Sequence, residues 1–245
     1  MKSKPAGLKK TRAQRPVKGE VREVLAALKR LASKRVRDEM GPRYGIHTKK
    51  AFGVPVGVMQ KVAKRYGRNH ELALALWETG WYEARMVASF VDEPARVTPA
   101  QMDRWCRDFD NWGIVDTVCF KLFDRTPHAF EKVEQWARRS DEFGKRAGVV
   151  LLACLALHDK QADDAAFARC LPLVERAASD ERNFVKKGVS WALRAIGRRN
   201  RKLYAATVVM ARRLAASKET AAKWVGKDVL RELLSPAVAR RFAVR

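Results

Sequence analysis

The sequence predicts an all-α protein built as an α-solenoid, an extended stack of about six helical hairpins. Two observations carry this prediction. Apolar residues recur at helical spacing in one segment after another from Val21 to about residue 234, and no segment alternates with period two for long enough to form a strand. Glycine and proline together number 23 of the 245 residues, a low share that disfavours a sandwich or barrel rich in tight turns.

The helices can be placed one by one from this periodicity. The first is expected over residues 21–39, where apolar residues such as Val24 and Leu28 form one face between charged neighbours. A break marked by glycine and proline follows. From there, helical patterns succeed each other with short connections, and we place them at residues 55–66, 70–79, 82–92, 99–109, 112–124, 127–138, 142–158, 162–178, 183–198, 201–216 and 219–234.

These twelve helices pair into six hairpins of about 30 to 40 residues, close to the roughly 40-residue period of HEAT and armadillo units. In such a stack the second helix of each hairpin lines the concave surface. The repeats are degenerate, and no residue recurs at a fixed position throughout the chain. A compact all-α bundle is therefore the alternative architecture.

The charge of the chain indicates a polyanionic partner. There are 51 Lys and Arg residues against 27 Asp and Glu, which gives a formal net charge of +24. Residues 1–19 hold seven Lys or Arg, no acid and few large apolar side chains, so they are expected to form a flexible basic arm. We accordingly expect the arm at 1–19, a HEAT-like domain at 20–236 and a basic tail at 237–245.

Several function classes are disfavoured. The longest apolar run, Ala147 to Leu157, has 11 residues, against about 20 for a membrane-spanning helix. The four cysteines form no Cys-x-x-Cys pair and the four histidines lie in no metal or nucleophile motif, so we expect reduced core thiols, no metal and no cofactor. The basic N-terminus is followed by no apolar signal region, which favours a cytoplasmic, nucleoid-associated monomer, with a transit peptide as the alternative.

Residues 184–197, FVKKGVSWALRAIG, form an amphipathic helix with two opposite stripes. The apolar stripe consists of Val185, Val189, Ala192 and Ile196. The opposite stripe, an indole among three cations, consists of Lys187, Trp191, Arg194 and Arg198. Cations that neutralise phosphates, with an aromatic ring for a sugar or base, are what nucleic-acid contact requires. The equally weighted alternative is that Trp191 packs against a neighbouring helix and the cations are merely solvated.

Residues 110–123, DNWGIVDTVCFKLF, place a carboxylate in apolar surroundings. One helical face holds Trp112, Asp116, Cys119 and Phe123, and Asp116 is the only acid between Trp112 and Phe123. Burying a carboxylate is expensive unless it is paired, caps a helix or serves a purpose. From this segment alone, a structural aspartate satisfied by backbone groups is favoured over a catalytic one.

The hairpin register brings these residues together. If the second helices begin near residues 112, 142, 183 and 219, their fifth positions are occupied by Asp116, Arg146, Lys187 and Lys223. These side chains, together with nearby tryptophans, would converge on the concave surface. The sequence therefore predicts a cationic, aromatic groove that carries a single carboxylate.

The same segments resemble the bacterial DNA-alkylation-repair glycosylases of the AlkD family, which are HEAT-like repeat proteins. The resemblance is carried by a Trp-x-x-x-Asp pair at Trp112 and Asp116, by Lys145 and Arg146, and by the FVKKGVSWALR helix. Weaker agreement lies in YGI at 44–46 and WYEARMVA at 81–88, so the likeness spans about residues 40–234. The chain departs from the pattern at Gly113, where some members carry a polar or acidic residue, which bears on specificity more than on activity.

The resemblance implies a DNA glycosylase that releases N3- and N7-alkylated purines from duplex DNA without flipping the damaged base. It implies that Trp112, Asp116 and Trp191 form the active cleft and that Arg146 is a groove arginine. We expect the phosphates to be held by Arg146, Lys186, Lys187, Arg194 and Arg198.

The chemistry of such a substrate fits this set of residues. A purine alkylated at N3 or N7 is already cationic and leaves without a general acid, so no catalytic histidine is needed. Asp116 would stabilise the oxocarbenium-like transition state, with its pKa lowered by the neighbouring cations. Two alternatives stay open: a solenoid that binds distorted or branched DNA without cutting it, and a HEAT-type scaffold for an acidic protein.

Overall fold

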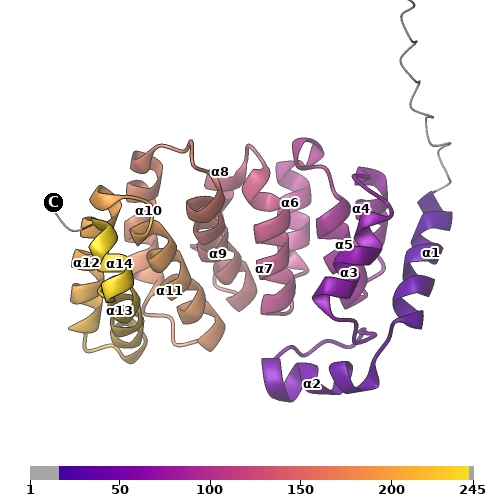
Figure 1. Ribbon diagram of the computed structural model, residues 1–245, viewed down its shortest axis with the longest axis horizontal. Coiled ribbons are helices and arrows are strands. Elements are labelled where there is room, and N and C mark those ends of the chain that lie inside the picture. The colour runs from indigo at the N-terminus through magenta and orange to yellow at the C-terminus, as the bar shows by residue number, and fades with distance from the viewer. Residues whose placement is uncertain (1–16, 243–245) are drawn as a thin grey trace, which may run out of the picture.

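The computed structural model describes residues 17–242, and every regular element in that range is a helix, as predicted. The helices follow one another in chain order from α1 at one end of an elongated array to α14 at the other (Figure 1). This extended arrangement is a solenoid and not a compact bundle. The flexible arm expected at 1–19 lies outside the described residues up to position 16, and so do residues 243–245 of the expected tail.

The described helices have the following bounds. The N-terminal part contains α1 (Val17–Arg30), α2 (Lys34–Tyr44), α3 (Val56–Lys64), α4 (His70–Trp77), α5 (Tyr82–Val91), the 3-10 helix η1 (Pro94–Arg96) and α6 (Pro99–Arg107). The rest contains α7 (Trp112–Lys121), the 3-10 helix η2 (Phe123–Arg125), α8 (Ala129–Trp136), α9 (Glu142–His158), α10 (Asp164–Ala177), α11 (Asn183–Gly197), α12 (Arg201–Ala215), α13 (Thr220–Leu233) and α14 (Pro236–Phe242).

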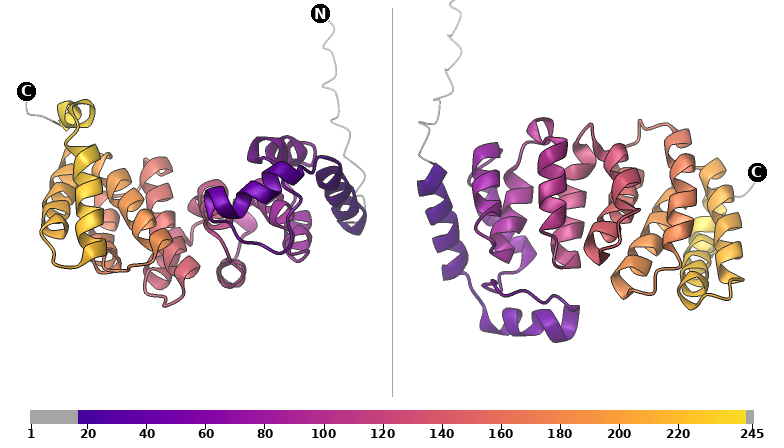
Figure 2. Two further views of the ribbon diagram at one scale, coloured as in Figure 1. Left: turned by 90° about the horizontal axis from the view of Figure 1, so that it is seen from below. Right: turned by 180° about the vertical axis from the view of Figure 1, so that it is seen from behind.

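The helices form two layers, and the second helices of successive hairpins make up one of them. In this layer α5 packs on α7, α7 on α9, α9 on α11 and α11 on α13. In the other layer α8 packs on α10 and α10 on α12 (Figures 1 and 2). The second helices therefore share one surface of the array, which is the arrangement that the predicted hairpin register requires.

The core confirms several sequence expectations. The apolar stripe of α11, from Val185 to Ile196, is fully buried. All four cysteines are buried and free, and burial raises the pKa of each thiol. Most helix bounds differ from the expected ones by one to three residues, and α9 has the expected bounds.

The N-terminal end differs from the prediction. A single helix was expected over 21–39, but α1 ends at Arg30 and α2 begins at Lys34, with Ser33 as its cap. The break between α1 and α2 is held by a segment distant in sequence, because the backbone N–H of Ser33 donates to the carbonyl of Phe52, at 3.2 Å. The next residue, Gly53, has φ +80° and leaves no room for a side chain against the backbone of Ser33. No local signal for these contacts exists in residues 21–39.

Both ends of the expected domain division are also shifted. Helix α1 begins at Val17, inside the segment assigned to the arm, and α14 occupies most of the segment assigned to the tail. The ring of Phe242 in α14 stacks on Tyr204 of α12, with centroids 4.8 Å apart. This stacking places the C-terminal helix against the last repeat.

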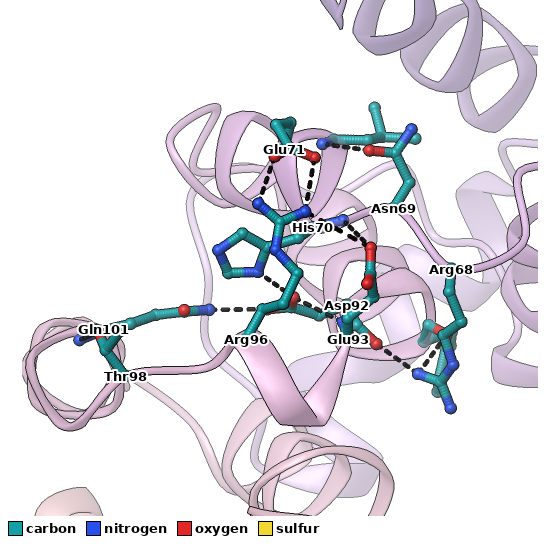
Figure 3. A network of polar contacts seen from close by, with 11 residues as sticks. Arg68, Asn69, His70, Glu71, Asp92, Glu93, Arg96, Thr98 and Gln101 are labelled. Atoms are coloured by element: carbon teal, nitrogen blue, oxygen red, sulfur yellow. Dashed lines mark hydrogen bonds and ion pairs between the residues drawn. The ribbon is translucent and has the colours of Figure 1, made fainter. Parts of the chain in front are cut away.

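Buried polar contacts fasten neighbouring repeats to each other. Figure 3 shows one such network around Asp92, whose carboxylate contacts Nδ1 of His70 at 2.6 Å and accepts from Nε2 of Gln101 at 2.7 Å. Arg68 donates to the carbonyl of the same residue, and Arg96 forms a bidentate pair with Glu71. The network joins α4, the end of α5, η1 and α6 into one unit.

Candidate active site

A cavity of about 500 Å³ opens between α2, α3, α5 and α7. Most of its walls are apolar, with Met40, Met59 and Met86 among the lining residues. Trp112 and Asp116, from one face of α7, lie in the same wall. The structure therefore brings two of the three residues expected in the active cleft to one cavity.

The start of α7 positions this face. Asn111, almost fully buried, caps the helix through its side-chain oxygen, which accepts from the backbone N–H of Ile114 at 3.0 Å. Gly113 is packed so closely that a Cβ there would lie 2.8 Å from the hydroxyl oxygen of Tyr82. A larger residue at this position, where the chain departs from the AlkD pattern, would therefore require the Tyr82 side chain to shift.

Trp112 is held by a second element of the site. Its indole Nε1–H donates to the carbonyl oxygen of Tyr44, the last residue of α2, at 2.8 Å. The indole is half-buried and packs against the hydrophobic core. Because the bond crosses from α7 to α2, the orientation of the ring depends on the placement of both helices.

Asp116 is held by a bidentate pair with Arg146 of α9. Nε of Arg146 donates to one carboxylate oxygen at 2.9 Å and Nη2 donates to the other at 2.8 Å. The Asp116 side chain is 20% exposed and that of Arg146 is 7% exposed. The remaining Nη1 of Arg146 donates to the carbonyl of Phe184 at the start of α11. The arginine therefore links three successive second helices and fixes the carboxylate.

The electrostatics of Asp116 differ from the expectation. Burial raises the pKa of this carboxyl above its ordinary value of 3.8, although the charge and hydrogen bonds of Arg146 act in the opposite direction. A lowered pKa was expected because the sequence shows the cations and not the degree of burial. The correction matters for the pH at which the carboxylate is ionised.

Arg146, which was expected to hold a phosphate, is engaged within the protein in this structure. Its guanidinium is buried against Asp116 and the Phe184 carbonyl. In this arrangement it positions the carboxylate. The fifth-position register, by contrast, is correct for Asp116 and Arg146, which meet as predicted.

The α11 residues lie farther along the array. Trp191 is half-buried, packs against the core and does not line the cavity. Lys187 is exposed and makes no ion pair within residues 17–242. The ammonium of Lys186 lies 5.5 Å from the ring centroid of Trp224 on α13. The cavity therefore contains two of the three residues expected in the cleft, and the place of Trp191 in that cleft stays a prediction.

Arg194 and Arg198 are paired with acids of α13. Nη1 of Arg194 lies 2.6 Å from one carboxylate oxygen of Glu232, and Nη1 of Arg198 lies 3.0 Å from the other. Asp228, one turn earlier, accepts from the hydroxyl of Ser190 at 2.6 Å. In this structure both guanidinium groups that were expected to hold phosphates contact a carboxylate of α13, so their assignment to DNA stays a prediction.

Sequence reasoning missed Tyr82 as part of the site. It lines the cavity with Trp112 and Asp116, and its hydroxyl lies against Gly113. Burial, together with the charges of Glu83, Asp110 and Asp116, raises the pKa of this phenol, so it stays protonated. The segment WYEARMVA around Tyr82 was one of the weaker points of resemblance and held the available signal.

Two absences hold within the described part of the chain. Within residues 17–242, no group of His, Cys, Asp and Glu side chains is arranged to hold a metal ion. No helix in this range is long and apolar enough to cross a membrane.

A two-layered array of helical hairpins, with an arginine-held carboxylate beside an indole on its second helices, defines a HEAT-like helical repeat protein. Comparison with protein-family models then identifies the particular family: the model described as DNA alkylation repair enzyme matches residues 24–228. The chain belongs to this family.

The fold agrees with a solved structure. That structure is described as a new family of proteins related to the HEAT-like repeat DNA glycosylases with affinity for branched DNA structures. The likeness has a TM-score of 0.72 at 20% sequence identity and covers 86% of this chain and 94% of the other. At this identity it shows a shared fold. No curated protein matches the sequence.

Proposed function

We propose that the protein is a DNA glycosylase that hydrolyses the N-glycosidic bond of cationic N3- and N7-alkylated purines in duplex DNA. The observation that carries the proposal is the Asp116 carboxylate, fixed through both oxygens by Arg146 in the wall of a cavity that it shares with Trp112. Membership of the DNA alkylation repair family supports it.

The reaction needs few groups from the protein. An N3- or N7-alkylated purine carries a positive charge and departs as a neutral base, so no proton donor is required. As the glycosidic bond stretches, positive charge moves to the deoxyribose, and a carboxylate held in place stabilises this charge without reorganisation. Asp116 takes this role and also orients the attacking water. The bond between carbon and nitrogen breaks with its electron pair going to the base, the water oxygen bonds to the sugar carbon, and one proton of that water is released to solvent.

Trp112 provides the apolar contact for the sugar. Its ring is held by the Tyr44 carbonyl at one edge, which leaves the π face for a cationic sugar or base. Such a contact is worth about 0.5 to 2 kcal/mol, depending on how far water is excluded. We assign Trp191 to a DNA contact farther along the array, since it lies outside the cavity.

Phosphate contacts come from lysines in this proposal. Lys187 is exposed and unpaired within the described residues, whereas Arg194 and Arg198 are engaged by Glu232. Lys186, beside Trp224, is close enough to contribute. Such contacts position a duplex without reading its sequence. The base is expected to be released without being flipped into a pocket.

A second candidate function is binding of branched DNA without catalysis. It is favoured by the fold neighbour, a family with affinity for branched DNA structures. It is also favoured by the bidentate pair, since both Asp116 oxygens are already engaged in the structure. A non-catalytic clamp, however, has no use for a carboxylate beside phosphates, which is why the glycosylase is the first proposal.

The deciding experiment is a single-turnover panel of lesions in one duplex context, with free base as the readout. We expect release of 7-methylguanine and 3-methyladenine, and none of uracil, hypoxanthine or ethenoadenine, because those neutral bases need proton donation or a fitted pocket. Equal rates on hypoxanthine and 7-methylguanine would contradict the electrostatic mechanism. Tight binding of a four-way junction with no release of any base would favour the second function.

A further inference from the structure

A second cavity, which we call the basic basin, lies at the carboxyl ends of α3, α5 and α7. Its volume is about 490 Å³, and its lining includes Lys64, Arg68, Lys121 and Arg125 but no acid. The other lining residues are uncharged, with Phe90 of α5 among them. Four cations around one hollow repel each other, so the basin is suited to an anion.

Two cations of the basin, Arg68 and Lys121, are held in place by groups other than carboxylates. Nη1 of Arg68 donates to the carbonyl oxygens of Phe90, at 3.3 Å, and Asp92, at 2.5 Å, so its charge has no carboxylate there. The ammonium of Lys121 lies 4.8 Å from the ring centroid of Phe120. Side chains ordered before binding lose less conformational entropy when a ligand arrives.

The other cations of the basin can also contact a bound anion. Lys64 is exposed, and neither it nor Lys121 makes an ion pair within residues 17–242. The carboxylate beside Arg125 is that of Asp124, 3.9 Å away, and this acid is fully buried and bonded to His158. This situation contrasts with that of Arg194 and Arg198, whose charges are met by an acid of the next repeat.

The basin adjoins the active-site cavity along α5 and α7. Met86 of α5 lines the cavity, and Phe90, one turn later on the same face, lines the basin. On α7, Thr117 lines the cavity and Lys121, again one turn later, lines the basin. At 1.5 Å per residue, the five steps from Asp116 to Lys121 span about 8 Å along the helix axis. α3, α5 and α7 lie beside one another in the array (Figure 1).

We propose that the basic basin binds the phosphate backbone of the same DNA duplex whose damaged nucleotide faces Asp116. The proposal rests on the glycosylase function and adds the surface that anchors the substrate. A duplex carries about one charge per 1.7 Å of its axis, and its major groove is about 12 Å wide. A duplex with one deoxyribose at Asp116 therefore brings neighbouring phosphates to a distance of about 8 Å, where the basin begins.

The test compares two double variants of equal charge. Lys64→Gln with Lys121→Gln removes two cations of the basin. The control, Arg169→Gln with Lys202→Gln, removes two exposed cations of α10 and α12 that have no ion pair within the described residues. Each variant is titrated with a duplex containing one 7-methylguanine, and with the unmodified duplex, over a range of salt. Base release is measured separately at saturating enzyme.

The expected result is a shallower dependence of log K on log salt for the basin variant alone. Two lost phosphate contacts lower the slope by about 1.8, so a fourfold rise in salt costs the wild type about 12-fold more affinity than it costs the variant. Base release at saturating enzyme separates binding from chemistry, because the basin does not touch the reacting atoms. A loss of rate there that the control variant does not share would place the basin residues in the active site and overturn their anchoring role. A slope equal to that of the wild type would overturn the proposal.

The two proposals fail in different ways. If the wild type releases no base, the glycosylase function fails, while the salt slopes on unmodified duplex still test the basin. A polyglutamate peptide added as competitor tests the other class of partner. If the peptide binds the wild type as tightly as the duplex does and loses affinity equally in the basin variant, an acidic protein is the occupant and the DNA assignment is wrong.

Discussion

Two contacts between neighbouring second helices, the α7–α9 junction and the α11–α13 junction, are each built from arginine–carboxylate pairs. They differ in which charged group stays accessible. In the first, the carboxylate of Asp116 is held by Arg146, which is nearly buried. In the second, the arginines stand on the earlier helix and are 30% and 46% exposed, with Glu232 28% exposed between them. The first junction presents an oriented carboxylate, and the second covers two cations with a carboxylate.

This difference teaches that the net charge of a surface does not reveal which charge is free. A buried arginine acts as a rigid support for its partner, since it cannot turn toward solvent without losing three hydrogen bonds. An exposed arginine paired with glutamate can exchange this partner for another, because exposed ion pairs contribute little to the free energy of unfolding. The two junctions can therefore be separated by mutation.

The largest effect is expected for Arg146→Met at the first junction. It leaves the Asp116 charge partly buried without a partner, which costs about 3 to 5 kcal/mol in the free energy of unfolding. Glu232→Gln, the matched change at the second junction, should cost no more than about 1 kcal/mol. Urea unfolding of both variants measures the difference, and equal losses would mean that the junctions do not differ in kind.

Asp116→Asn is expected to reduce release of 7-methylguanine by about 10² to 10³, equivalent to about 2.7 to 4 kcal/mol of transition-state stabilisation. Affinity for the duplex should stay the same or rise, since the change removes a negative charge beside DNA. Single-turnover assays and titrations measure the two separately. Near-wild-type release by a folded variant would remove Asp116 from the mechanism.

The pH dependence of base release tests whether Asp116 at the α7–α9 junction acts as an ionised carboxylate. Only ionised Asp116 stabilises the sugar cation, and burial raises its pKa above 3.8. Activity should therefore fall tenfold per pH unit below the raised pKa, starting at a higher pH than for an ordinary aspartate. The free energy of unfolding should change with pH in the opposite direction to the activity. Because the folded state binds the Asp116 proton more tightly than the unfolded state does, the contribution of Asp116 to stability is favourable at low pH and is lost as the pH rises through the raised pKa. An activity limb at or below 3.8 would contradict the assignment.

Glu232→Gln should strengthen duplex binding, because it removes the only carboxylate paired with Arg198 in the described residues and one of the two paired with Arg194, the other being Asp228 at 3.9 Å. If both arginines then contact phosphates, the slope of log K against log salt should steepen by up to about 1.8. Base release at saturating enzyme should not change. An unchanged slope would show that the α11–α13 arginines face away from the DNA.

The smallest effect is expected for Lys187→Gln, the change of a single exposed cation. Loss of one phosphate contact should make the salt slope shallower by about 0.9. Stability should be unaffected, since the side chain makes no ion pair within the described residues. Titration beside Lys202→Gln, a change of equal charge on α12, provides the control.

Much of the fold was predictable because its determinants are local. The period of apolar residues fixed α9 and α11 to within a residue, and the hairpin register placed Asp116 opposite Arg146. The break between α1 and α2 was not predictable, because it depends on Phe52 and Gly53 some twenty residues away. Periodicity reports which face of a helix is apolar, and says nothing about a contact with a distant loop.

The site was predictable to a smaller extent. The indole and the carboxylate of α7 could be found, since they lie four residues apart on one face. The pairing of Arg194 with Glu232 could not, because it joins positions 38 residues apart in different repeats. The direction of the Asp116 pKa shift depends on burial, which a sequence does not display.

The end of α2 has a consequence for how the array meets DNA. In a solenoid each repeat contacts only its neighbours, so the curvature of the whole array is easily changed. Here Tyr44 is bonded to α7 through Trp112, and the adjoining Gly45 lies against Phe184 at the start of α11. These contacts connect the end of α2 with both α7 and α11, so they oppose a change in the spacing of these second helices. We therefore expect the surface formed by the second helices to keep its shape when DNA binds, so that the duplex bends to fit the protein.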